Sequence, residues 1–216
     1  MTAVDICNMA LARIGQRSIT TMEDVGTEAG FCRQFYNRTR RLLLRQYPWR
    51  FALRSEAMVR SLDALGDPLE DVEWEYVCDI PATSLRLVDI RHPRATAQIP
   101  YELQGENILL NHFDADNTPS ETQIRYVADV GGYTAPVVGP PAGPAVDDAD
   151  MLDDSFIDAF VCRLAADLAM PITGDPAKQV AMLQLFTAVM PTAQAASATE
   201  ARKYTRGSET LAASRF

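Results

Sequence analysis

Hydrophobic residues recur with the 3.6-residue spacing of an α-helix along residues 31–53. Pro48 disfavours the α conformation at the residue before it, so we predict a helix that begins between Asp24 and Thr27 and ends near Gln46. One side of this helix is expected to be buried and holds Phe31, Cys32, Phe35, Thr39, Leu42 and Leu43. Arginines mark another side and aromatic residues follow the helix: Arg38, Arg41 and Arg45, then Tyr47, Trp49 and Phe51.

Three further stretches have helical spacing. Thr2 and Asp5 fit a capping box, which predicts a first helix over about residues 3–14. Another helix is expected after the aspartates of residues 147–154, and it should end at Met170 and Pro171, because proline interrupts a helix. The last helix is expected to begin at the turn around Pro176 and to kink at Pro191.

Between these helices the hydrophobic pattern has a period of two, which is typical of β-strands. Residues 55–72 look like a polar crossing before the first strand. Residues 131–147 are rich in glycine and proline and predict an extended loop or tether after the last strand. The alternating stretches are residues 74–79, 85–90, 99–103, 107–111 and 123–130, of which the third and fourth form a hairpin around residues 104–106.

Together these elements predict an α+β fold. Residues 1–72 and 131–200 should form an antiparallel bundle of about four helices, and residues 73–130 a small antiparallel β-sheet domain inserted between the two helical halves. Residues 201–216 have few apolar groups and cannot bury enough surface to fold alone. We expect this extended C-terminal tail to dock on a partner chain.

Charge is distributed unevenly along the chain. The formal net charge is −9, yet residues 1–60 carry ten arginines and five acids, whereas residues 61–216 carry ten basic and 24 acidic residues. A protein that grips DNA is usually basic overall, which this chain is not. The four cysteines include no CxxC pair and are expected to be buried, reduced thiols. We find no signal peptide and no apolar run of the roughly 20 residues that a membrane span needs, so no membrane partner is expected.

Side chains that could carry a reaction or hold a metal are sparse. The sequence contains none of the common phosphate-binding, dinucleotide-binding, serine-hydrolase or zinc-protease motifs. His92 and His112 fall at different strand ends, and Glu73 and Glu75 share one strand face, so a metal pair or a carboxylate pair competes with a purely structural interpretation. The aspartates of residues 147–154 lack the spacing of a calcium loop and suit a helix N-terminus. We therefore expect that the protein is not an enzyme and that it binds no metal and no cofactor.

The arginines of the helix over residues 31–46 allow three interpretations. They could form a solvated face that pairs with the acidic remainder of the chain. Arg38, Arg41 and Arg45 could instead form a subunit contact with acids of a neighbouring copy, with Trp49 as an aromatic anchor. They could also grip DNA phosphates, although aromatic residues are not interleaved on the arginine side.

Four stretches of the sequence, in order, resemble the tail tubular protein A family, the head-to-tail adaptors of short-tailed bacteriophages. The first, DICNMALARIGQRSIT, resembles the first helix of that family, and the others resemble the end of its second helix, its entry into the β insert and its third helix with the following turn. These three stretches are residues 41–52, with LLL and YPWRFA, residues 76–82, YVCDIPA, and residues 156–175, with FIDAF, LAADLA and ITGD.

The resemblance implies a structural protein of the virion, located in the neck or tail and assembled in the host cytoplasm. Such adaptors form a ring of about twelve copies between the portal protein and the tail nozzle or next tail protein. DNA passes through the lumen without specific binding, and an acidic body favours its passage because it repels phosphate. Two alternatives remain open. One is a DNA-binding or packaging accessory protein that uses residues 31–54, and the other is a small hydrolase or transferase without a known motif. The portal would bind the C-terminal tail through Arg202, Lys203, Tyr204, Arg206 and Phe216.

Overall fold

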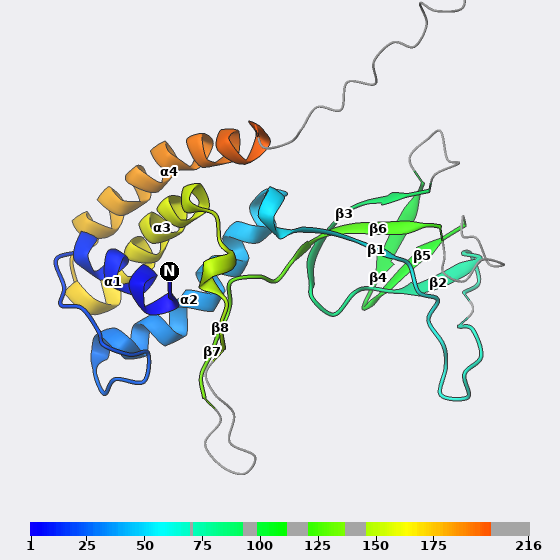
Figure 1. The fold of residues 1–216 in the computed structure, drawn as a ribbon, viewed down its shortest axis with the longest axis horizontal. Coiled ribbons are helices and arrows are strands. Elements are labelled where there is room, and N and C mark those ends of the chain that lie inside the picture. Colours follow the sequence, from blue (N-terminus) through cyan, green and yellow to red (C-terminus); the bar gives the residue numbers. More distant parts are fainter. Residues whose placement is uncertain (70, 93–98, 112–120, 137–145, 200–216) are drawn as a thin grey trace, which may run out of the picture.

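The computed structural model describes residues 1–69, 71–92, 99–111, 121–136 and 146–199. Helices occupy one end of its long axis and strands the other (Figure 1). The chain leaves the helices after Gln46 and returns to them after Ala128, so the β-rich part is inserted between two helical halves. The predicted α+β fold, a helical bundle with inserted antiparallel sheets, is thereby confirmed.

Within the described ranges the helical part contains α1 (Ala3–Arg13), α2 (Thr27–Gln46), α3 (Asp154–Thr173) and α4 (Pro176–Thr199). Local signals in the sequence explain several helix ends. The Asp5 N–H donates to the Thr2 hydroxyl and the Thr2 N–H to the Asp5 carboxylate, which confirms the predicted capping box. The Asp153 carboxylate caps α3 by accepting the Ser155 N–H at 2.8 Å, and Gly174 ends the helix in the left-handed conformation, with φ 64°.

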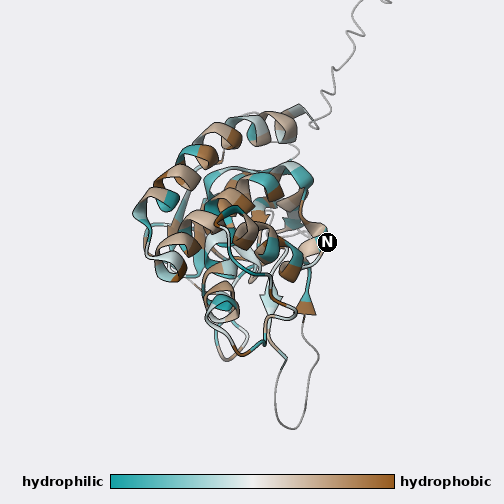
Figure 2. Ribbon diagram, turned by 90° about the vertical axis from the view of Figure 1, so that its left-hand side faces the viewer, coloured by the Kyte–Doolittle hydropathy of each residue, from teal (hydrophilic) through white to brown (hydrophobic). Residues whose placement is uncertain are grey.

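Helix α3 is the centre of the helical part and contacts α1, α2 and α4. Phe156 and Phe160 are fully buried on it, and the rings of Phe160 and Tyr36 of α2 meet edge to face with their centroids 5.2 Å apart. Figure 2 looks onto the helices, which carry both brown, hydrophobic positions and teal, hydrophilic ones. The helical part therefore depends on α3, which the sequence supplies only after the whole β-rich insertion.

Pro171 interrupts its helix less than predicted. Helix α3 continues through Pro171 to Thr173 instead of ending at residues 170–171. Helix α4 includes Pro191 and continues to Thr199, and the kink expected at Pro191 stays a prediction. In the last turn of α3 the Thr173 hydroxyl donates to the Ala169 carbonyl at 2.7 Å, and the Gly174 N–H donates to the Met170 carbonyl at 3.0 Å. These bonds and the contact with α4 hold the turn that proline alone would disfavour.

The β-rich part consists of two antiparallel three-stranded sheets. One has the order β1-β6-β3 and the other β2-β5-β4, and β4 and β5 are the predicted hairpin. The strands β2, β3 and β6 also lie where alternation predicted them. The bounds are β1 (Leu53–Ala57), β2 (Tyr76–Asp79), β3 (Ser84–Arg91), β4 (Tyr101–Gln104), β5 (Asn107–Leu110) and β6 (Gln123–Ala128).

Strand β1 corrects the prediction that residues 55–72 are a polar crossing of the helical domain. It pairs with the central strand β6, with Leu53 opposite Val127 and Ala57 opposite Gln123. Its residues are partly or fully exposed, so it lacks the apolar alternation that identifies a strand in a sequence. The expected domain boundary at residue 72 consequently falls inside the β-rich part.

Two further strands, β7 (Tyr133–Thr134) and β8 (Val146–Asp147), pair within the stretch predicted as a loop over residues 131–147. Residues 137–145 of that loop lie outside the described residues. None of the helices in the described ranges is long and apolar enough to cross a lipid bilayer.

Candidate interaction surface between helix α2 and the β-rich part

A buried arginine joins the helices to the strands. Arg40 points from α2 toward the segment that leaves β6, where its Nη2 lies 2.6 Å from Oδ1 of Asp129. Its Nη1 donates to the Val130 carbonyl. The Arg40 side chain is only 2% exposed, and burial lowers the pKa of its guanidinium, an effect that the charge of Asp129 opposes. An arginine stays charged near neutral pH despite such a shift, so this is a buried ion pair.

Neighbouring residues of α2 bind the same segment. The Tyr36 hydroxyl donates to the Gly131 carbonyl at 3.2 Å. The Asn37 side chain donates to the Tyr133 carbonyl at 2.6 Å and accepts the Tyr133 N–H at 3.1 Å. Residues 129–133 are thus held along α2 through their backbone, which fixes the β-rich part relative to the helices. We call this set of contacts the junction.

Two exposed arginines extend the junction toward the surface. Arg41 contacts Oδ2 of Asp129 through Nε and Nη2, each at 2.8 Å. Nε of Arg45 donates to the Leu85 carbonyl on β3 at 2.9 Å, and Nη1 of Arg86 donates back to the Arg45 carbonyl at 3.0 Å. Arg41 therefore pairs with an acid of its own chain, whereas Arg45 binds a backbone carbonyl. Their proposed role in a subunit contact stays a prediction.

Arg38 differs from these two. It is exposed, and no polar partner is found for its side chain among the described residues. It lines a pocket of about 450 Å³ together with Arg41, Leu42, Arg45 and Leu85. We call these five residues the arginine pocket. Arg45 and Leu85 also line an adjoining groove of about 520 Å³ that reaches Leu103 on β4.

Leu42 lies in the arginine pocket and is 44% exposed, although the helical wheel predicted that it would be buried. Arg40, which the wheel did not place in the core, is buried instead. The helix is rotated so that Arg40 reaches Asp129, and this rotation brings Leu42 to the surface. The lining of the arginine pocket consequently combines two leucines with three arginines.

Trp49 is not available as a subunit contact in this conformation, because it is fully buried. Its ring centroid lies 5.0 Å from that of Phe156 in an edge-to-face arrangement, and its indole N–H donates to the Leu43 carbonyl at 2.9 Å. Tyr47 and Phe51 pack on either side of it, with centroid distances of 5.2 and 6.3 Å. The aromatic residues after α2 anchor the start of the β-rich part to α3.

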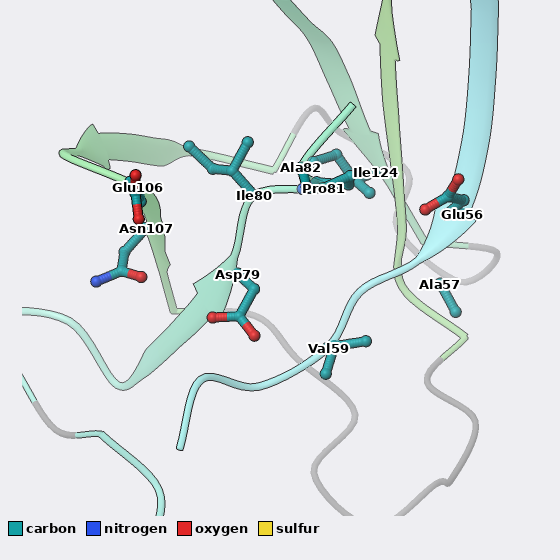
Figure 3. Close-up of a pocket in the computed structure, with 10 residues that line it drawn as sticks. All are labelled: Glu56, Ala57, Val59, Asp79, Ile80, Pro81, Ala82, Glu106, Asn107 and Ile124. Atoms are coloured by element: carbon teal, nitrogen blue, oxygen red, sulfur yellow. The ribbon is translucent and has the colours of Figure 1, made fainter. Parts of the chain in front are cut away.

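Figure 3 shows a second pocket, of about 460 Å³, between the two sheets. Its carboxylates do not converge, since Glu106 and Glu56 lie at opposite ends and Asp79 lies between them. Glu56 accepts the Tyr126 hydroxyl at 2.6 Å, and Asp79 accepts the Ser61 hydroxyl. Glu56 and Asp79 are thus each engaged by a different hydroxyl group.

The other candidate residues have separate surroundings. His92 is buried, with its Nε2 3.8 Å from Glu121, and His112 lies outside the described residues. All four cysteines are free and buried, and burial raises the pKa of the Cys78 thiol to about 11. Over the described ranges, no three histidines, cysteines or acids lie close enough together to hold a metal ion.

The expected portal-docking residues cannot be placed. Arg202, Lys203, Tyr204, Arg206 and Phe216 all lie outside the described residues, which end at Thr199. A scan against models of protein families and a search of curated proteins find no match to this chain. Its function is therefore inferred from its own residues and geometry and from the motif resemblance described above.

Proposed function

We propose that this chain is a head-to-tail adaptor of a short-tailed phage virion, which forms a ring between the portal protein and the tail nozzle or next tail protein. The arginine pocket is the observation that carries the proposal. It gives an acidic chain a basic surface that also includes two leucines, and such a surface suits a contact between protein subunits. The resemblance of the four sequence stretches names the kind of assembly.

The structure bears on the alternative, a DNA-binding accessory protein that uses residues 31–54. Most arginines of this region are engaged within the chain: Arg33 donates to the Met22 carbonyl, Arg54 to the Phe51 carbonyl, and Arg40, Arg41 and Arg45 form the contacts described above. Phosphate binding would compete with these bonds. Only Arg38 and Arg50 favour the alternative, because their side chains are exposed and have no polar partner among the described residues. Among these residues, the one bond of Arg50 to a side chain, that of Ser197, comes from its backbone N–H.

A ring of acidic subunits suits a DNA conduit. Residues 61–216 carry 24 acidic and ten basic residues, and a lumen lined by such surface would repel the phosphates of passing DNA. Residues 201–216, with Arg202, Tyr204 and Phe216, would dock on the portal. No catalytic role and no cofactor form part of this proposal.

The test is the native mass of the purified full chain, alone and mixed with the portal ring encoded by the same genome. We expect a portal-bound species that carries many copies of the chain. In parallel, binding to duplex DNA is measured at physiological salt, where a conduit protein should bind weakly. A chain that ignores the portal but binds DNA with nanomolar affinity would overturn the adaptor and establish the DNA-binding alternative.

A further inference from the structure

A second surface of the molecule has the opposite charge to the arginine pocket. Residues 61–75 contain six acids and no lysine or arginine. They join β1 to β2, and Figure 1 shows them projecting from the end of the β-rich part that is remote from the helices. We call residues 61–69 and 71–75 the acidic arm.

The acidic arm exposes large apolar side chains among its carboxylates. Leu62 is 57% exposed, Leu65 at the tip is 88% exposed, and Val72 is fully exposed. Scattered single apolar residues are normal on a surface, but three on one short projection mark a candidate contact site. Asp63, Asp67, Glu73 and Glu75 are exposed beside them, so the arm combines an apolar centre with negative charge.

The tip of the arm is a defined hairpin. The Leu69 N–H donates to the Ser61 carbonyl at 3.0 Å and the Asp63 N–H to the Asp67 carbonyl at 2.8 Å. The Asp63 carboxylate accepts the N–H groups of Leu65 and Asp67 at 2.8 and 2.9 Å. At its base, the Ser61 N–H donates to the Val77 carbonyl of β2 at 2.9 Å. The exposed leucines are thus presented on ordered backbone, which lowers the entropic cost of binding.

We propose that the acidic arm of one copy of this chain docks in the arginine pocket of a second copy. The arm would place Leu62 or Leu65 against Leu42 and its carboxylates beside Arg38, the arginine of the pocket whose side chain has no polar partner among the described residues. Charge complementarity supports this occupant, because both surfaces expose leucine side chains and carry charges of opposite sign. This contact rests on the proposed ring, for which it supplies the subunit interface.

The placement of the two surfaces makes the contact intermolecular. The arm lies at the far end of the strands, whereas the pocket lies where α2 meets β3 (Figure 1). A contact between different surfaces of identical copies is heterologous, so an open chain keeps a free arm at one end and a free pocket at the other until a ring closes. Such a contact builds rings or open chains of copies and does not stop at a symmetric dimer.

Two variants test this contact with the full chain. Leu42→Glu disables the pocket and Leu65→Glu disables the arm, and both side chains are exposed, so folding should be retained. Val25→Glu is the matched control, because Val25 is fully exposed and lies in neither surface. The sedimentation of each chain is measured at low salt and at protein concentrations up to about 1 mM. At that concentration even a weak contact, with a Kd of about 1 mM, is occupied in about half of the copies.

We expect the wild-type chain and the Val25→Glu control to gain mass with concentration, and Leu42→Glu and Leu65→Glu each to stay monomeric. A mixture of the two monomeric variants should form a 1:1 dimer and nothing larger, because one intact arm can still enter one intact pocket. Higher salt should weaken the wild-type association, since charges contribute to it. If Leu42→Glu does not fold, Arg38→Glu replaces it, because the Arg38 side chain has no polar partner to lose among the described residues.

Three results would overturn the docking: a wild-type chain that is monomeric throughout, a Leu65→Glu chain that associates like wild type, or a mixture that forms no dimer. The proposed function is read separately, from portal binding. Portal-bound rings of Leu65→Glu would remove the docking contact and leave the adaptor standing. Self-association through arm and pocket without portal binding would support the docking contact and remove the adaptor function.

Discussion

Arg40 shows how one buried charge can hold two parts of a molecule together. We expect Arg40→Met to lower the free energy of unfolding by about 3 kcal/mol, because Asp129 loses its buried partner and Val130 its donor, while Arg41 still contacts Asp129. Arg38→Met is the matched control on the same helix and should change the free energy by no more than about 0.5 kcal/mol. Urea denaturation measures both, and equal effects would contradict the role given to the junction.

Gly131 is required in the junction for two reasons. Its φ of 73° is left-handed, and a Cβ built there would lie 2.4 Å from a methyl carbon of Leu152. Gly105 has a similar φ of 63° but no atom within 4 Å of an added Cβ. Both alanine variants should lose about 1–2 kcal/mol from the backbone conformation, and Gly131→Ala about 1–3 kcal/mol more from the clash. Thermal unfolding of the two variants measures the difference between their losses of stability. Equal losses for Gly131→Ala and Gly105→Ala would contradict the clash with Leu152.

The burial and contacts of single residues are the features of this structure that the sequence predicts least well. A helical wheel treats residues by spacing alone, and it placed Leu42 inside and did not single out Arg40. The true rotation of α2 depends on Asp129 and the backbone after it, which lie about 90 positions later in the sequence. Trp49 shows the same limit, because an aromatic residue after a helix can be an interface anchor or a core residue, and only its contact with Phe156 decides.

The hairpin of the acidic arm should be sensitive to acid. Two backbone N–H groups, of Asp67 and Leu65, hold the pKa of the Asp63 carboxyl below its ordinary value of 3.8. Because the folded pKa is lowered, the stabilisation is present above the ordinary pKa and is lost as the pH falls through the folded one. We expect the amide NMR signals of Leu65 and Asp67 to shift together below pH 3.8.

Asp63→Asn is the control for this titration, because the amide keeps an oxygen that accepts hydrogen bonds and removes the ionisable group. In that variant the two amide signals should no longer follow a carboxylate titration. If they titrate as in the wild-type chain, another acid of the arm controls the hairpin, and Asp63 does not.

Elements with strong local signals could be predicted from the sequence. The bounds of α1 and α2 follow from a capping box and from Pro48, and the hairpin of β4 and β5 follows from alternation around Gly105. Strand β1 has no such pattern, and it is a strand because the neighbouring β6 pairs with it. The last turn of α3 likewise depends on bonds from Thr173 and Gly174, which outweigh the local effect of Pro171.

At the scale of the whole molecule, the sequence predicted the insertion of strands between helices and the basic character of α2. It did not predict the arginine pocket or its counterpart, the acidic arm. The pocket combines Leu85 of β3 with residues of α2 that lie about 40 positions earlier, so it exists only after the two parts are joined. Most of the arm belongs to the predicted polar crossing, because a row of acids with isolated leucines has no regular period that would indicate an element.

The late position of α3 in the chain has a consequence for synthesis on the ribosome. Helices α1 and α2 emerge first, but the helix that buries their apolar sides follows only after the whole β-rich part. At typical translation rates the roughly 100 intervening residues take on the order of 5–20 s. During that interval the apolar sides of α1 and α2, which include Ile6, Leu11 and Leu43, lack their contacts with α3. The strands, delivered in one uninterrupted run, can pair before the helices they separate are able to meet.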